Sequence, residues 1–97
     1  MPDGAVTLAQ FEPLVGSDFT LQLGEAGCLT ARLIEACPGP WTPPEGRAPF
    51  CLTFEAPEPA LPQRTYRLEH AQMGGMDIFL VPVARTAAGL QYEAVFG

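Results

Sequence analysis

The fold is decided by the stretch YRLEHAQMGGMDIFLVPVARTAAGLQYEAVF, which occupies residues 66–96. It contains two glycine-bearing turns, at Gly74-Gly75 and at residues 86–89, and alternating apolar residues flank both of them. Such dipeptides between alternating runs are typical of tight β-hairpin turns. The stretch therefore predicts three antiparallel strands joined by two hairpins.

The two turns predict the same inward face for the central strand. The first turn pairs Met73 with Met76, and the second pairs Arg85 with Leu90. Residues directly opposite each other in an antiparallel pair share a face of the sheet. The predicted inward residues are therefore Tyr66, Leu68, His70, Phe79, Val81, Val83, Tyr92, Ala94 and Phe96.

A further hairpin is predicted upstream, where apolar and polar residues alternate from residue 19 to residue 23. A three-residue turn with Gly27 in the left-handed region pairs Leu23 with Leu29. A four-residue turn would instead set Phe19 against Arg32 and bury a charge beside an aromatic ring. The three-residue turn is therefore favoured.

The remaining strands are separated by proline-rich connections. One strand runs from Leu29 to about Cys37 and stops at Pro38, and residues 50–54 resume strict alternation. Between them, residues 38–49 hold five prolines and form a stiff, semi-extended loop. Residues 57–62 form a second proline-rich connection.

The N-terminal segment predicts one or two helical turns. Thr7 and Gln10 have the spacing of a capping box, and apolar residues then recur at helical spacing from Leu8 to Val15. Pro13 ends the α-helical pattern early. We expect this segment to cover an open end of a sheet or barrel.

Together these segments predict a single all-β domain over residues 1–97. About six antiparallel strands in so short a chain bury a common face only by curling. The predicted fold is a small antiparallel barrel or a sharply bent sheet, with a short N-terminal helical turn.

Composition excludes some classes of partner. The net charge is −6 with five arginines and no lysine, which disfavours binding to nucleic acid. No stretch approaches the roughly 18 apolar residues that span a membrane, and the N-terminus lacks the pattern of a secretory signal. Cys28, Cys37 and Cys51 are odd in number and have no framework spacing. We therefore expect reduced thiols, no bound metal and a cytoplasmic location.

Four separated strings carry a resemblance to a known family. They are LxxFxPLVG from Leu8, YRLEH from Tyr66, FLVPV from Phe79 and YEAVF from Tyr92. In this order they resemble an uncharacterised family of bacterial β-rich proteins of about this length. The resemblance implies no catalytic residue, and it implies an accessory role beside phage-tail-like or tail-collar-like proteins.

The residues do not predict a catalytic or cofactor site. His70 is the only histidine, and Glu69 points to the other face of its strand and cannot orient the imidazole. No pair of cysteines has the tight spacing of a zinc site, and no glycine-rich turn opens a helix. We expect a strand-end histidine bonded to the backbone near the turn, and a protein that is not an enzyme.

Two features are candidates for a protein interface. Trp41 lies in the proline-rich loop, where it either anchors a partner or folds back over the core. The predicted register also sends an apolar stripe outward, which a second copy, a partner or the chain itself covers: Met76, Ile78, Leu80, Pro82 and Val95.

The leading functional hypothesis is a non-catalytic structural or protein-interaction module that self-associates or binds a protein partner and holds no cofactor. The resemblance implies that it is an accessory of a phage-derived tail-like assembly. The alternative is a small-molecule-binding barrel. It requires an interior cavity. The seven aromatic residues expected on the inward face are sufficient to fill such a cavity, which disfavours a ligand.

Overall fold

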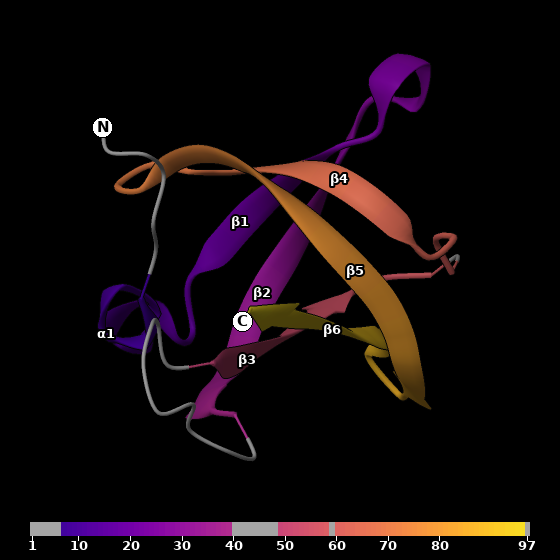
Figure 1. Cartoon of the computed structure of the whole chain (residues 1–97). Helices are drawn as coiled ribbons and strands as arrows, with labels where there is room; N and C mark the ends of the chain where they lie inside the picture. Colours follow the sequence, from indigo (N-terminus) through magenta and orange to yellow (C-terminus); the bar gives the residue numbers. More distant parts are fainter. Residues whose placement is uncertain (1–6, 40–48, 59, 97) are drawn as a thin grey trace.

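The computed structural model describes residues 7–39, 49–58 and 60–96, and its strands form one closed antiparallel barrel. Around the barrel the strand order is β1-β2-β3-β6-β5-β4, and β4 pairs with β1 to close it (Figure 1). This confirms the predicted all-β class and the barrel. The strands are β1 (Asp18–Gln22), β2 (Cys28–Pro38), β3 (Phe50–Ala56), β4 (Arg64–His70), β5 (Gly74–Thr86) and β6 (Gly89–Phe96).

The N-terminal segment covers one end of the barrel, as predicted. Helix α1 (Leu8–Phe11) begins at the Thr7 capping box, in which the Thr7 N–H donates to Gln10 Oε1 at 2.8 Å. The 3-10 turn η1 (Glu12–Leu14) continues it through Pro13. The ring of Phe11 is fully buried, with its centroid 5.8 Å from that of Phe50 and 5.9 Å from that of Phe96.

The first hairpin has the predicted faces but a different register. Leu21 pairs with Leu29 and Phe19 with Ala31, a shift of two residues from the predicted pairs. An even shift keeps the same residues inward, because side chains alternate with a period of two. The connection is longer than predicted, since the 3-10 turn η2 (Gly24–Ala26) lies within it and the Leu23 N–H donates to the Gly27 carbonyl at 2.7 Å.

The predicted inward face of β5 is wrong, and its first turn shows why. The turn comprises residues 71–73 rather than the two glycines, so His70 pairs with Gly74. Leu68 consequently pairs with Met76 and not with Val81, a shift of five residues. An odd shift moves every side chain of the strand to the other face. Gly74 follows the turn with a φ of 82°, a conformation that glycine adopts without strain.

The turn between β5 and β6 is as predicted, but a bulge on β5 precedes it. Arg85 pairs with Leu90, whereas the register shifts between Pro82 and Ala84, so Tyr92 faces Pro82 instead of Val83. One inserted residue again exchanges the two faces of the strand. The predicted pairings of β5 with β4 and with β6 therefore put the same wrong residues inward, because each differs from the observed pairing by an odd number of residues.

The barrel interior is filled with side chains. Strand β3 alternates strictly between buried and half-buried residues, and on β5 the inward residues are Ile78 and Leu80. A closed barrel of this size encloses only enough space for such side chains. The buried apolar residues are Phe11, Leu14, Phe19, Leu21, Ala31, Leu33, Phe50, Leu52, Phe54, Ala56, Tyr66, Leu68, Ile78, Leu80, Leu90, Tyr92 and Ala94.

Candidate functional site

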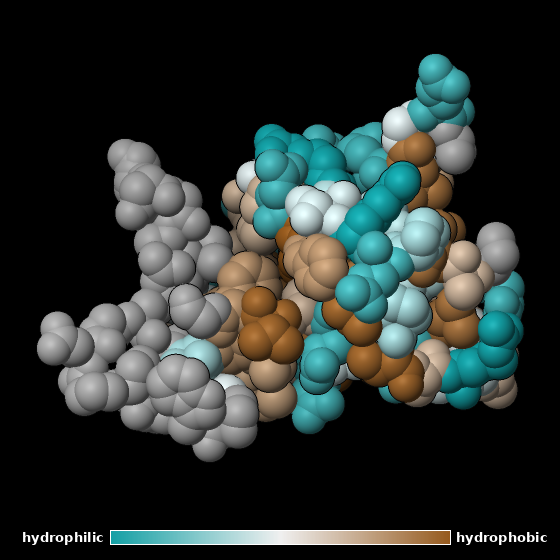
Figure 2. Space-filling view, turned by 45° about the vertical axis from the view of Figure 1, so that its right-hand side comes forward, coloured by the Kyte–Doolittle hydropathy of each residue, from teal (hydrophilic) through white to brown (hydrophobic). Residues whose placement is uncertain are grey.

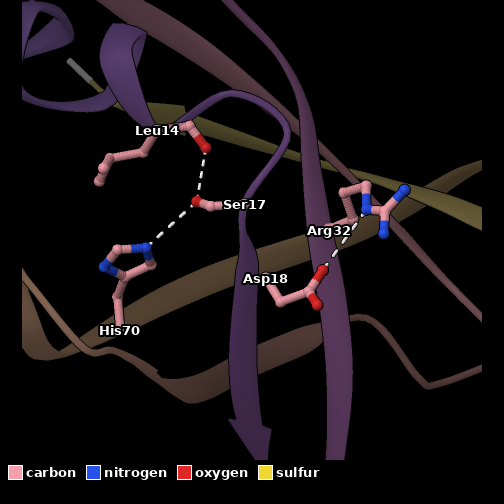
Figure 3. Close-up of polar contacts among 5 residues, drawn as sticks. All are labelled: Leu14, Ser17, Asp18, Arg32 and His70. Carbon is pink, nitrogen blue, oxygen red and sulfur yellow. Dashed lines mark hydrogen bonds and ion pairs between the residues drawn. The ribbon is translucent and has the colours of Figure 1, made fainter.

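A polar cluster joins the start of β1 to the end of β4 (Figure 3). The Ser17 hydroxyl donates to the Leu14 carbonyl at 2.6 Å, and Ser17 Oγ lies 3.1 Å from His70 Nε2. On the other side of the imidazole, the Gln72 backbone N–H donates to His70 Nδ1 at 3.0 Å. The ring also packs against Phe19, with centroids 4.4 Å apart.

These hydrogen bonds determine which ring nitrogen of His70 carries the proton. Because a backbone N–H can only donate, His70 Nδ1 is the acceptor and the neutral ring carries its proton on Nε2. Nε2 then donates to Ser17 Oγ, so the imidazole cannot remove the proton of that hydroxyl. The cluster ties η1 and β1 to the turn after β4, and the predicted histidine bonded to backbone near the turn is confirmed.

Two shallow, open depressions lie beside this cluster. One is lined by Asp18, Thr20, Glu69, His70 and Ala71. The other is lined by Asp18, Thr30, Arg32, Glu55, Ala56, Pro57 and Ala88. Within the described residues, no group of three or more histidine, cysteine, aspartate or glutamate side chains is placed to hold a metal ion. Neither depression has the enclosed, apolar character of a small-molecule site.

The predicted outward stripe does not exist as a surface. Ile78 and Leu80 point into the barrel and are 3% and 0% exposed, because the odd shifts of register exchanged the faces of β5. Of the five predicted stripe residues, Pro82 is exposed and Val95 is 67% exposed, whereas Met76 is half-buried and packs against the core. Trp41 lies outside the described residues.

A different apolar surface lies on the outer side of β5 and β6. We call it the β5–β6 patch, and it consists of Phe79, Val81, Val83 and Val95. The last pair of the β5–β6 ladder is Val81 with Glu93, and Phe79 and Val95 are the next outward residues beyond that pair. Phe79 is 50% exposed and Val83 51%. In Figure 2, apolar side chains reach the surface of the barrel between polar ones.

Acidic side chains border the β5–β6 patch. Across the strands, Glu93 pairs with Thr53 and Thr53 pairs with Glu35, which makes one outward row beside Val81. The ion pairs among the described residues are Asp18–Arg32, Asp77–Arg67 and Glu58–Arg85, and they do not include Glu35 or Glu93. The side of the patch towards β6 and β3 is therefore negatively charged, whereas on the β4 side Asp77 is paired with Arg67.

Two cysteines lie beside Val95 of the β5–β6 patch. Cys37 of β2 and Cys51 of β3 are directly opposite each other, and Cys51 is directly opposite Val95 of β6. Both thiols are free and half-buried. Burial, the Glu93 carboxylate and the Cys37 thiol, in that order, raise the pKa of the Cys51 thiol.

The sequence reasoning missed the β5–β6 patch and the cysteine pair. Phe79 and Val83 were assigned to the core because they alternate as strongly as Ile78 and Leu80 do. One signal pointed to the bulge: Pro82 has no N–H and within sheets is confined to edges and bulges. For the cysteines no such signal existed, because alternation from Leu33 puts Cys37 inward, and only the bulge between Leu33 and Glu35 turns it to the outward side that Cys51 occupies.

The comparisons with known proteins give a family and little else. Residues 6–96 match a family described as a domain of unknown function, DUF6916. The searches of curated proteins and of solved structures gave no match. The match confirms the resemblance to an uncharacterised family, and its description contains no reference to tail-like assemblies. Among the described residues, no helix has the length and hydropathy needed to cross a membrane.

Proposed function

The chain belongs to the DUF6916 family, a domain of unknown function, and we propose that it is a non-catalytic module that docks a protein partner through the β5–β6 patch. The observation that carries the proposal is the half-exposed ring of Phe79 on the outer face of β5, together with the exposed Val83 on β5 and the exposed Val95 on the neighbouring strand β6. Contiguous exposed apolar side chains on a small protein are typical of interaction surfaces, and aromatic residues are enriched in them.

The charges at the border of the patch define the partner. Glu35 and Glu93 lie outward beside it, and the whole chain carries a net charge of −6. Complementary potentials steer association, and like charges facing each other oppose it. The partner is therefore a protein segment that presents apolar side chains flanked by lysine or arginine. A second copy of the chain would bring the same acidic border and is disfavoured.

The alternative of a ligand-binding barrel has less support. A small-molecule site requires an enclosed apolar cavity of several hundred Å3. The interior of this barrel is occupied by aromatic and aliphatic side chains, and the two depressions described above are open rather than enclosed. The sequence-based prediction of an accessory role in a phage-derived tail-like assembly remains a prediction, and it would make the partner a protein of such an assembly.

Site-specific photo-crosslinking tests the proposal. The crosslinking residue p-benzoylphenylalanine replaces Val95 or Phe79 in the chain expressed at its natural level, and the cells are irradiated. Both positions should give the same covalent adduct with one partner protein. The substitution Glu93→Lys should deplete that adduct, because a cation would then face the basic side chains of the partner.

The control position is Thr30, an exposed residue on the outward side of β2 that lies away from the patch. Equal adducts from positions 30, 79 and 95, or no adduct from the two patch positions, would refute the docking surface. An adduct between two differently tagged copies of the chain would refute the basic partner and identify a homodimer instead. Far-UV circular dichroism of each variant establishes that the barrel is folded.

A further inference from the structure

The tertiary structure brings together two thiols that lie 14 positions apart in the chain. Cys37 and Cys51 are directly opposite each other on β2 and β3. Residues on either side of Cys51, Phe50 and Leu52, are buried, so both cysteines face outward from the barrel. The pair is half-buried and still reaches solvent.

The hydrogen bonding of the ladder gives the separation of the two residues. The Gly39 N–H donates to the Pro49 carbonyl at 2.9 Å, which makes Gly39 and Pro49 a hydrogen-bonded pair. Hydrogen-bonded and non-hydrogen-bonded pairs alternate along an antiparallel ladder, so Pro38 and Phe50 form a non-hydrogen-bonded pair and Cys37 and Cys51 form the next hydrogen-bonded pair. Pro38, which has no N–H, occupies the non-hydrogen-bonded position between the two hydrogen-bonded pairs.

This separation allows a disulfide but not a relaxed one. In a hydrogen-bonded pair the Cα atoms are about 5.5 Å apart, within the range of roughly 4.4–6.8 Å found across disulfides. The Cβ atoms of opposite residues are about 4.5–5.5 Å apart, whereas a disulfide needs about 3.5–4.5 Å. Closing the bond therefore pulls β2 and β3 together and strains the link, and strained disulfides are the easily reduced ones.

The third cysteine has no such neighbour. Cys28 is exposed at the beginning of β2, where it pairs with Gln22. Cys37 lies nine positions further along the same extended strand, which corresponds to roughly 30 Å. Cys28 therefore cannot compete for either thiol within the same barrel.

We propose that Cys37 and Cys51 are a reversible oxidation site, which closes to a disulfide by exchange with a low-molecular-weight disulfide such as glutathione disulfide. The Cys37 thiol loses its proton to solvent, and its sulfur attacks one sulfur of glutathione disulfide. The sulfur–sulfur bond of glutathione disulfide breaks, and one glutathione thiolate leaves. The Cys51 thiolate then attacks the Cys37 sulfur and releases the second glutathione, so two protein thiols are oxidised and one disulfide is reduced to two thiols.

The surroundings of Cys51 disfavour it as the first sulfur to attack glutathione disulfide. The thiolate is the attacking form. Burial, Glu93 and Cys37 raise the pKa of Cys51, which leaves less of it as thiolate near neutral pH. Cys51 lies directly across the ladder from Cys37, so it is placed to resolve a mixed disulfide formed on Cys37.

Incubation of the folded protein with glutathione disulfide, followed by mass spectrometry of the intact chain and of its peptides, tests the site. We expect loss of two of the three free thiols, a mass lower by two hydrogen atoms and a crosslink between the peptides of Cys37 and Cys51. The Cys28→Ser variant should give the same crosslink. The Cys51→Ser variant should hold glutathione on Cys37, and a modest excess of reduced glutathione should restore the wild-type thiols.

Three results would overturn the proposal. They are glutathione adducts on separate cysteines without the crosslink, dimers joined through Cys28 as the main product, and a crosslink that resists reduced glutathione. The Cys37→Ala variant provides the matched control, because it keeps Cys51 and the fold but should give no crosslink. Circular dichroism of each variant before oxidation separates loss of the site from loss of the barrel.

Discussion

Neighbouring residues on β5 should respond very differently to the same substitution. Leu80 is fully buried in the barrel, whereas Phe79 is half-exposed on the outer face, opposite Thr65 of β4. We replace each in turn by threonine, a residue that suits exposed strand positions. Leu80→Thr should be severely destabilising and Phe79→Thr mild, the reverse of what the sequence-based register predicts.

The burial of each side chain gives the expected free energies of unfolding. Leu80→Thr removes two buried carbons, worth about 1.6 kcal/mol, and leaves a buried hydroxyl without a partner, which costs about 1–3 kcal/mol. The sum is about 4 kcal/mol, a large part of the roughly 5–15 kcal/mol that stabilises a domain. Phe79→Thr loses about 50 Å2 of apolar burial, which costs about 1 kcal/mol.

Urea unfolding followed by far-UV circular dichroism measures both values. The midpoint for Leu80→Thr should fall several times further than that for Phe79→Thr, with little change in the slope m. Leu80→Met is the matched control, because it conserves volume and should cost less than about 1.5 kcal/mol. If Phe79→Thr were the more damaging variant, the inward face of β5 described above would be wrong.

Three further predictions concern single contacts. Tyr92→Phe should lower the free energy of unfolding by about 1 kcal/mol, because the Leu61 N–H that donates to the Tyr92 hydroxyl at 2.9 Å loses its partner; urea unfolding measures the loss. Gly89→Ala should cost at least about 1–3 kcal/mol, since φ is 140° and a Cβ would overlap the Ala56 carbonyl oxygen; a thermal melt indistinguishable from that of the wild type would contradict this. Alkylation of Cys51 by iodoacetamide should reach half its maximal rate at a higher pH in the folded protein than in urea, because the pKa of this thiol is raised. The same shift means that Cys51 stabilises the fold below its unfolded pKa, and that this contribution is lost as the pH rises through its folded pKa.

The alternation of apolar residues determined the class of fold. Strand β3 buries every second residue from Phe50 to Ala56, and a period of two is readable without any knowledge of the partner strand. The capping box at Thr7 and the end of β2 at Pro38 were also local signals, and both are found in the structure. A signal of this kind is readable because the residues that carry it are neighbours in the chain.

For strand β5, local signals were not sufficient to predict which face points inward. Both of its faces are apolar, with Ile78 and Leu80 on one and Phe79 and Val81 on the other, so alternation could not choose between them. The choice was made by a three-residue turn before the strand and a bulge near Pro82. Each changes the register by an odd number of residues, and each depends on how the whole strand fits its two neighbours in the closed barrel.

The same division applies to the candidate sites. The sequence by itself determined an all-β chain with a filled interior and a structural histidine. The position of the β5–β6 patch and the meeting of Cys37 with Cys51 were decided only by the tertiary structure. The physical reason is that strand pairing joins residues far apart in the chain, and the register of that pairing is set by side-chain packing and turn geometry across the whole barrel.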